Sequence, residues 1–229
     1  MGSFLMSARG RISPKVIWRT LLAVVLLLFL SRWRSSELPP LDVIDPESFQ
    51  QTGQPVDWSQ YAYLQYATAE SYVCNSVMIF ESLVRLGTKA ERLLVYPSHW
   101  PIGGPSYKGG LLAKARDEFG VHLLPIEIQH FEGEKTWADS FTKLLAFNQT
   151  QYKRVLSLDS DATVLQPMDE LFLIPSTPVA APSAYWLDKF SLSSQIVLIE
   201  PSETQFDRVQ HALKHRKNSE YDMEIVNEL

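Results

Sequence analysis

Residues 154–161 read Arg-Val-Leu-Ser-Leu-Asp-Ser-Asp, an apolar run of strand character that ends in two aspartates separated by one residue. Residues i and i+2 of a strand point to the same side, so Asp159 and Asp161 converge if strand geometry persists to its end. Two neighbouring carboxylates repel each other, and a hard cation such as Mn²⁺ or Mg²⁺ relieves that repulsion. The stretch therefore predicts a metal site that holds a diphosphate, with a solvated turn as the plain structural alternative.

Strand-like and helical segments alternate along the chain from Tyr61 onward, as judged by the spacing of apolar residues. The expected strands span residues 61–67, 92–96, 121–128, 154–158, 178–181 and 195–199. The expected helices span residues 70–86, 111–119, 141–148 and 204–214, with one more from Tyr221. This alternation predicts an α/β fold with a largely parallel central sheet, in which ligands bind beyond the carboxyl ends of the strands.

A glycine-rich stretch at residues 103–110 reads Gly-Gly-Pro-Ser-Tyr-Lys-Gly-Gly. It lacks both the spacing and the following Ser or Thr of a phosphate-binding P-loop, so Lys108 is not expected to bind a nucleotide in that way. We expect a mobile surface loop at these residues, followed by a short helix that begins near Leu111.

The composition suits a single globular domain, because 45% of the 229 residues are hydrophobic and 11% are aromatic. Charge divides unevenly, since residues 1–36 carry six basic side chains and no acid, which gives +6. The whole chain carries −5, so residues 37–229 carry −5 − 6, or −11, and this acidic body argues against a nucleic-acid partner. Cys74 is the only cysteine, which excludes an intrachain disulfide.

An uncharged apolar run at residues 20–31 follows a basic segment near the N-terminus. No A-x-A-like cleavage site follows the run, which favours an uncleaved signal-anchor at residues 17–31 over a cleaved signal peptide. Basic residues are more numerous before the run than after it, so residues 1–16 are expected in the cytoplasm and the body in the lumen. Residues 32–59, which contain four prolines, are expected to form a stem before a catalytic domain at residues 60–229. The short span suits a type II protein of the Golgi or another secretory-pathway membrane.

The segment from Phe141 to Phe172 resembles glycosyltransferase family 8, and it is similar to glycogenin and more so to the fungal glycogenin-like N-acetylglucosaminyltransferases. A helical lysine (Lys143), a strand, the D-x-D pair and an Asp-Glu-Leu-Phe turn at residues 169–172 occur there together and in order. The resemblance extends over roughly residues 61–227. It implies a GT-A fold and a metal-dependent transfer of a sugar from a nucleotide diphosphate, with retention of the anomeric configuration.

The resemblance also implies roles for single residues around the D-x-D pair. Asp159 and Asp161 match the metal ligands of the family, and Ser160 matches the residue whose backbone faces the nucleotide ribose. Lys143 matches the lysine that meets the phosphate and sugar of the donor, a role suited to a flexible point charge. Asp222 matches an aspartate at a helix start near the reacting carbon, although methionine replaces the glutamine that follows it in much of the family.

Two further segments resemble parts of the family that contact the donor. Residues 66–72 resemble the segment that encloses the uracil, and residues 192–198 resemble an Asn-Ser-Gly turn that contacts the donor sugar. In the second segment this chain has serine in place of asparagine and glutamine in place of glycine. The residues implied to bind the donor are Tyr66, Ala67, Thr68, the stacking ring Tyr72, Ser193 and Ser194.

The family takes a third metal ligand from a histidine in a His-x-x-Gly-x-x-Lys-Pro-Trp-like segment near its C-terminus. No such segment occurs in these 229 residues, so we expect the catalytic domain to be incomplete at this end. An inactive protein of the same fold is therefore one alternative function for this chain.

The resemblance implies UDP-GlcNAc or UDP-Glc as the donor and a luminal glycan or glycoprotein as the acceptor. A different chemistry also fits the central motif, since residues 159–163 read D-x-D-x-T after a strand. In a phosphatase of the haloacid-dehalogenase type, Asp159 would be the phosphorylated nucleophile and Asp161 the acid and base. That motif normally lies near the start of its domain, and no adjacent Asp-Asp or Gly-Asp follows it here.

Overall fold

The computed structural model describes residues 55–127, 141–187, 190–217 and 219–229. The signal-anchor expected at residues 17–31, the basic tail and most of the expected stem lie outside these residues. Within the described ranges, no helix is long and apolar enough to cross a membrane.

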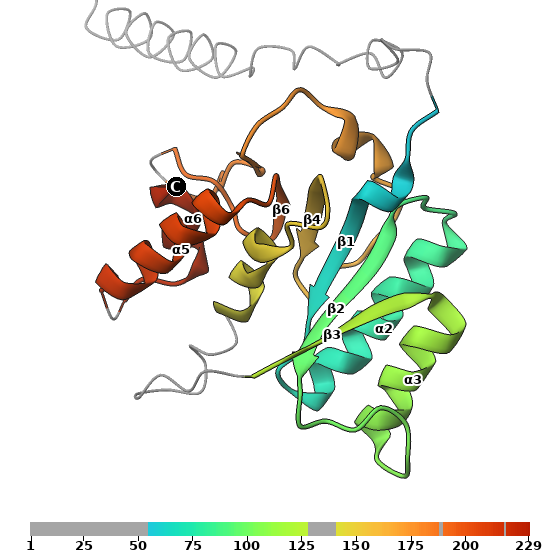
Figure 1. Cartoon of the computed structure of the whole chain (residues 1–229). Coiled ribbons are helices and arrows are strands. Elements are labelled where there is room, and N and C mark those ends of the chain that lie inside the picture. The colour runs from blue at the N-terminus through green and yellow to red at the C-terminus, as the bar shows by residue number, and fades with distance from the viewer. Residues whose placement is uncertain (1–54, 128–140, 188–189, 218) are drawn as a thin grey trace, which may run out of the picture. The chain divides into compact units, whose positions relative to one another are not determined.

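A mixed sheet forms the centre of the described domain, with the strand order β3-β2-β1-β4-β6-β5 (Figure 1). The first four of these strands run parallel, whereas β6 is antiparallel to both β4 and β5. The strands are β1 (Tyr61–Tyr66), β2 (Glu91–Pro97), β3 (Val121–Ile126), β4 (Arg154–Leu158), β5 (Val179–Ala180) and β6 (Ile196–Ile199). The prediction of an α/β fold with a mostly parallel sheet is confirmed.

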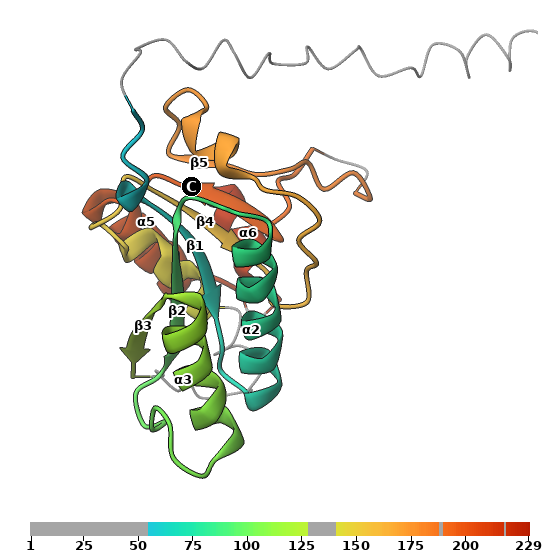
Figure 2. The same cartoon turned by 90° about the vertical axis from the view of Figure 1, so that its right-hand side faces the viewer.

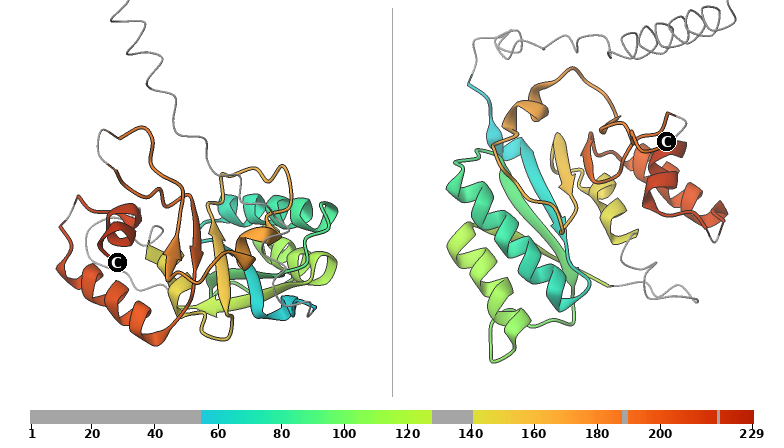
Figure 3. Two further views of the ribbon diagram at one scale, coloured as in Figure 1. Left: turned by 90° about the horizontal axis from the view of Figure 1, so that it is seen from above. Right: turned by 180° about the vertical axis from the view of Figure 1, so that it is seen from behind.

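Helices cover both faces of the sheet (Figures 2 and 3). Successive residues of β1 point to opposite faces, so that Tyr63 joins one buried apolar cluster and Leu64 joins the other. The helices packed on the Tyr63 face are α2 (Glu70–Arg85), α3 (Tyr107–Phe119) and η4 (Asp169–Leu173). The helices packed on the Leu64 face are η3 (Leu144–Asn148), α5 (Glu203–His215) and α6 (Asp222–Glu228). A 3-10 turn, η2 (Trp58–Gln60), precedes β1.

The longest described helix, α2, follows the apolar spacing of its sequence. Val73 and Phe80 are fully buried against the sheet, as the spacing predicts. The spacing also points to Val84, but this side chain is 40% exposed and Leu83 is buried in its place. The helix ends at Arg85, and Gly87 adopts a φ of 74°, a left-handed conformation that favours glycine after a helix.

The helix expected from Leu111 begins four residues earlier, at Tyr107, so the last two glycines of the stretch 103–110 are helical rather than part of a surface loop. The Ser106 side chain accepts a hydrogen bond of 3.2 Å from the Gly109 N–H, which caps the helix start. The Gly103 N–H in turn donates to the Gly109 carbonyl at 2.7 Å. The sequence did not predict this helix start, because glycine has a low helix propensity. The hydrogen bonds of Gly109 with Ser106 and Gly103 offset that low propensity.

Two other segments differ from expectation in detail. β3 ends at Ile126, two residues before the end of the expected strand, and it includes Pro125, which its position at the edge of the sheet permits. Residues 141–143 form α-helix as expected, but the chain then tightens into the 3-10 helix η3 and not into a continued α-helix. That tightening follows directly after Lys143, a residue of the candidate site.

Candidate active site

The candidate site lies where the connections of the sheet change direction. From β1, the chain crosses to β2 and β3 on one side and later returns to β4 on the other side, so β1 and β4 are neighbours in the sheet. In open α/β sheets, ligands bind at the carboxyl ends of such a pair of strands. The residues found there are Tyr66, which ends β1, and Asp159, which directly follows β4.

An ammonium group joins two carboxylates at this edge. Lys143 Nζ lies 2.5 Å from Asp159 Oδ1 and 3.3 Å from Asp222 Oδ2. The Lys143 side chain is 4% exposed, and the two carboxylates remain 25% and 16% exposed. Three residues to which the sequence analysis gave roles are thus brought together: one directly before η3, one directly after β4 and one at the start of α6. Their contact is a tertiary arrangement that the sequence analysis did not predict.

Burial raises the pKa of the Asp159 carboxyl, because a buried charge loses its hydration. The charge and the hydrogen bond of Lys143 act in the opposite direction, whereas the negative charges of Asp222 and Asp161 raise this pKa further. Burial followed by the charges of Asp159 and Asp222 also raises the pKa of the Tyr66 phenol. Tyr66 therefore lies among the carboxylates of the site and remains a neutral phenol at physiological pH.

The D-x-D pair does not keep strand geometry. β4 ends at Leu158, and Asp159 begins a turn in which its carbonyl accepts a hydrogen bond of 3.1 Å from the Ala162 N–H. Asp161 is exposed, and Ser160 between the two is buried. Among the described residues, no group of three or more His, Cys, Asp or Glu side chains forms a metal cluster. The structure thus places one aspartate of the pair partly buried beside Lys143 and the other exposed after the turn.

The turn that the sequence analysis associated with the donor sugar lies next to the D-x-D pair. Gln195 accepts a hydrogen bond of 3.0 Å at its carbonyl from the Asp159 N–H. The Gln195 N–H donates to Ser193 Oγ at 3.4 Å, and both Ser193 and Ser194 are buried. This backbone contact brings the expected sugar-binding serines to the same edge of the sheet as the expected metal ligands.

The segment expected to enclose the uracil turns away from the sheet at the end of β1. The Ala67 N–H donates to the Val95 carbonyl at 2.9 Å, and Ala67 itself is fully buried. Thr68 Oγ1 is buried and has no hydrogen-bond partner in the described part of the chain. Tyr72 lies near enough to Tyr66 to raise the pKa of its phenol. The Thr68 hydroxyl of this segment could therefore form a hydrogen bond with a polar group of a bound ligand.

A buried polar network that the sequence analysis missed supports the site. Tyr63 donates to Asp169 Oδ1 at 2.9 Å and accepts from the Met168 N–H at 3.2 Å, which fixes the chain segment after the D-x-D pair to β1. Asp169 also accepts from the Lys89 N–H at 2.8 Å. A side chain with a polar group in an otherwise apolar strand, such as Tyr63 in β1, is the sequence signal for such a network. That signal does not identify the residue to which the polar group bonds.

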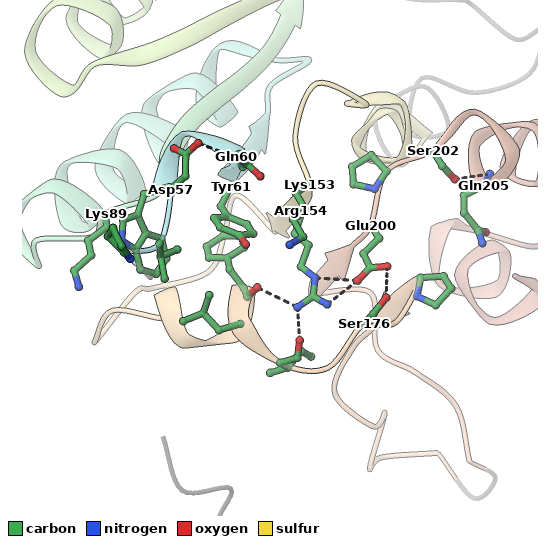
Figure 4. A pocket seen from close by; sticks show the side chains of 18 residues that line it. Asp57, Gln60, Tyr61, Lys89, Lys153, Arg154, Ser176, Glu200, Ser202 and Gln205 are labelled. Atoms are coloured by element: carbon green, nitrogen blue, oxygen red, sulfur yellow. Dashed lines mark hydrogen bonds and ion pairs between the residues drawn. The ribbon is translucent and has the colours of Figure 1, made fainter. Parts of the chain in front are cut away.

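A large cleft lies at the opposite, amino-terminal edge of β1 and β4 (Figure 4). Inside it, Arg154 Nη2 lies 2.6 Å from Glu200 Oε1, and Ser176 donates to Glu200 Oε2 at 3.0 Å. Arg154 Nη1 also donates to the carbonyls of Phe172 and Ile174. Arg154 and Glu200 thus neutralise each other, and their hydrogen bonds connect β4 and the residue after β6 to the segment that follows η4.

The described domain has the fold of solved glycosyltransferases. The glycosyltransferase GlyE of Streptococcus pneumoniae in its apo form aligns with 74% of this chain and 42% of its own, with a TM-score of 0.55 and 18% identity. The galactosyltransferase LgtC, solved with donor and acceptor sugar analogues, aligns with 72% of this chain and 69% of its own, with a TM-score of 0.56 and 12% identity. At these identities the likeness shows the fold alone, and that fold is the GT-A fold expected from the sequence.

Fungal proteins named Glucose N-acetyltransferase 1 are similar to this chain in sequence. The protein from Gibberella zeae is 58% identical over 184 residues, which are 76% of this chain and 41% of the relative. The protein from Aspergillus fumigatus is 39% identical over 231 residues, which are 91% of this chain and 58% of the relative. The chain thus spans about half the length of these curated relatives, and no family profile matches it.

The chain is therefore similar in sequence to the fungal Glucose N-acetyltransferase 1 proteins, and its described domain has the fold of solved glycosyltransferases. This result confirms the resemblance to the fungal glycogenin-like enzymes. It does not favour the phosphatase alternative, for which Asp159 would have to be a nucleophile.

Proposed function

We propose that this chain supplies the nucleotide-sugar site of a retaining glycosyltransferase that moves GlcNAc or glucose from a UDP-sugar to a glycan or glycoprotein. The observation that carries the proposal is the contact of Lys143 with Asp159 and Asp222 at the carboxyl edge of β1 and β4. The name of the fungal relatives supports GlcNAc as the sugar.

Asp159 and Asp161 are the residues proposed to hold Mn²⁺, or Mg²⁺ in its place. They fit such an ion chemically, because both offer hard carboxylate oxygens and both keep some exposure to solvent. When bound, the cation would supply Lewis acidity that stabilises the departing diphosphate. The protein's own part is to hold Asp159 in place. Lys143 donates to the Asp159 carboxylate, and the Asp159 backbone N–H donates to the Gln195 carbonyl.

Lys143 is proposed to bind the negative charge of the donor phosphates. Its ammonium group has three N–H donors and already contacts two carboxylates, which hold it as a point charge at the edge where the diphosphate would lie. Because Lys143 is almost fully buried, water screens its charge less than it would screen the charge of a surface lysine.

Asp222 is proposed as the carboxylate nearest the reacting carbon. It is the first residue of α6 and remains 16% exposed, so it is open to a ligand from one side while Lys143 holds it from the other. Retention requires either attack on the same face as departure or a nucleophile of the protein, and Asp222 is the residue to test for the second route.

The placement of the domain follows from the sequence beyond the described residues. We propose a type II protein whose catalytic domain lies in the lumen of the Golgi or another secretory compartment. The support is the apolar run at residues 20–31 with four basic residues before it and two after it. A luminal domain would meet glycan acceptors there, which agrees with the proposed reaction.

Calorimetry with UDP, in the presence and absence of Mn²⁺, tests the binding site directly. We expect measurable affinity for UDP that Mn²⁺ strengthens by at least about tenfold, because the cation joins the diphosphate to the two aspartates. A UDP-release assay with UDP-GlcNAc and UDP-Glc then compares the two sugars. Equal UDP affinity with and without Mn²⁺ would contradict the metal site, and lack of UDP binding would contradict the proposed function as a whole.

A further inference from the structure

A buried glutamine lies on β1 beside the candidate site. Gln65 is fully buried, as is Ser76 of α2, which faces it. The Gln65 side chain donates from Nε2 to the Leu158 carbonyl at 2.7 Å and accepts at Oε1 from Ser76 Oγ at 3.2 Å. A fully buried amide must satisfy both its ends, and here one end reaches the last residue of the strand that delivers Asp159.

The glutamine bridges a place where two strands part. β1 pairs with β4 only as far as Leu64 opposite Ser157, whereas it continues along β2 to Tyr66 opposite Val95. The backbone of β1 thus follows β2 beyond Leu64, so β1 has no backbone residue paired with Leu158. The Gln65 side chain reaches across this gap and supplies the donor that the backbone no longer offers.

The bond that Gln65 makes acts on one particular peptide unit. The carbonyl of Leu158 and the N–H of Asp159 belong to the same peptide group, which is planar. Gln65 holds its oxygen at 2.7 Å, and the Gln195 carbonyl accepts from its N–H at 3.0 Å. Held from both sides, the peptide plane cannot rotate freely, and its orientation sets the direction in which the Asp159 side chain leaves the backbone.

We propose that Gln65 is a positioning residue that aims the Asp159 carboxylate into the site. It touches neither the carboxylate nor, in the proposed function on which this inference rests, the donor. Its effect passes through the Leu158–Asp159 peptide, and Ser76 restrains it from α2, the helix that also carries Tyr72. These contacts connect α2, which carries the expected uracil-stacking residue Tyr72, to the peptide of the expected metal ligand Asp159. They therefore restrain the distance between the two.

The first test measures the peptide itself and needs no ligand. In Gln65→Met the side chain keeps a similar length and volume but loses its donor and acceptor. We expect hydrogen exchange at the Asp159 amide of the full chain, followed by NMR, to become at least about tenfold faster than in the parent. The control is Leu83→Ala, which removes buried volume from the same side of the sheet. It is expected to lower Tm without singling out the Asp159 amide.

The second test measures the ligand site. Electron paramagnetic resonance of free Mn²⁺ in the presence of UDP gives the affinity of each variant for the metal. Loss of groups that orient metal ligands costs about 10–100-fold in affinity, so Gln65→Met is expected to fall in that range and Leu83→Ala to remain within about twofold of the parent. If Gln65→Met does not fold, Ser76→Ala, which leaves Gln65 bonded to Leu158 alone, is expected to shift both measurements in the same direction by a smaller factor.

The outcomes separate this inference from the proposed function. Unchanged exchange at the Asp159 amide in both Gln65→Met and Ser76→Ala would overturn the positioning role. So would equal loss of Mn²⁺ affinity in Gln65→Met and Leu83→Ala, since that would reveal only a general loss of stability. A parent chain that binds no Mn²⁺ with UDP would instead contradict the proposed metal site, while the exchange measurement would still decide the role of Gln65.

Discussion

Lys143 and Asp159 form an ion pair of 2.5 Å in which the lysine is 4% exposed and the aspartate 25% exposed. The pair joins the start of η3 to the end of β4, and Asp222 approaches the same ammonium group from α6 at 3.3 Å. One cation therefore holds together three elements of the chain, and its removal would leave two carboxylates close to each other in a partly buried site. We therefore expect Lys143 to contribute to the stability of the fold as well as to the proposed donor binding.

We predict that Lys143→Met lowers the free energy of unfolding by roughly 1–3 kcal/mol, because it leaves Asp159 and Asp222 without their shared partner. Urea unfolding of Lys143→Met, Asp159→Asn and the double variant measures the coupling of the pair. A coupling energy of about 0.5–3 kcal/mol is expected for side chains in contact. Strictly additive effects would show that the ion pair contributes nothing to the fold.

Asp161→Asn is predicted to abolish the Mn²⁺-dependent part of UDP binding with little effect on the fold. Asp161 is exposed, so we expect its free energy of unfolding to change by less than about 0.5 kcal/mol. Calorimetry with UDP and Mn²⁺ is the measurement. The matched control is Asp207→Asn, an exposed aspartate on α5, which should bind like the parent. Binding by Asp161→Asn equal to that of the control would exclude Asp161 as a metal ligand.

Glu200→Gln is predicted to destabilise the fold in a pH-dependent way. Burial alone would raise the pKa of Glu200, but hydrogen bonds from Arg154, Ser176 and Thr177 together lower it below its ordinary value of 4.5. A lowered pKa in the folded state means that the charged form adds stability above pH 4.5, and that this stability is lost as pH falls through the folded-state value. We expect a deficit of roughly 1–3 kcal/mol at pH 7.

Chemical unfolding at a series of pH values checks this prediction. The difference between Glu200→Gln and the parent should be constant from pH 8 to pH 6 and should shrink on acidification below pH 4.5. A difference that grows at low pH would show that Arg154 does not stabilise the ionised form of Glu200.

Tyr63→Phe is predicted to lower the free energy of unfolding by about 1–3 kcal/mol, because the buried Asp169 carboxylate loses a donor and the Met168 N–H loses an acceptor. Tyr61→Phe is the matched control on the same strand and the same face of the sheet. The hydroxyl of Tyr61 makes no hydrogen bond to the described residues, so its removal should cost less than about 0.5 kcal/mol. Thermal and urea unfolding compare the two, and equal losses would contradict the buried network.

A luminal domain is predicted to carry a glycan at Asn148, which begins the sequon Asn148-Gln149-Thr150. The asparagine ends η3 and is exposed, so the glycosylation machinery can reach its side chain. A mobility shift on endoglycosidase treatment that is absent in Asn148→Gln would support the luminal placement. Protease treatment of intact microsomes is the decisive measurement, since complete digestion of residues 60–229 from outside would contradict that placement.

Local sequence patterns determined the elements of the fold and much of the candidate site. Strand-like and helical spacings predicted the α/β alternation, and the apolar run before Asp159 located the strand that ends at the site. These patterns can be recognised in the sequence because the spacing of side chains along one face of a helix or strand depends only on a few consecutive residues. Resemblance to known transferases added Lys143 and Asp222, which no local spacing relates to Asp159.

Tertiary structure alone decided how these residues meet. It placed Lys143 between Asp159 and Asp222, and it ended β4 at Leu158 so that the D-x-D pair lies in a turn. It also brought Gln65 across the gap between β1 and β4 to a carbonyl far along the chain. The physical reason is the same each time: a buried polar group must find a partner, and which partner lies within hydrogen-bond distance depends on the packing of distant segments, not on neighbours in the sequence.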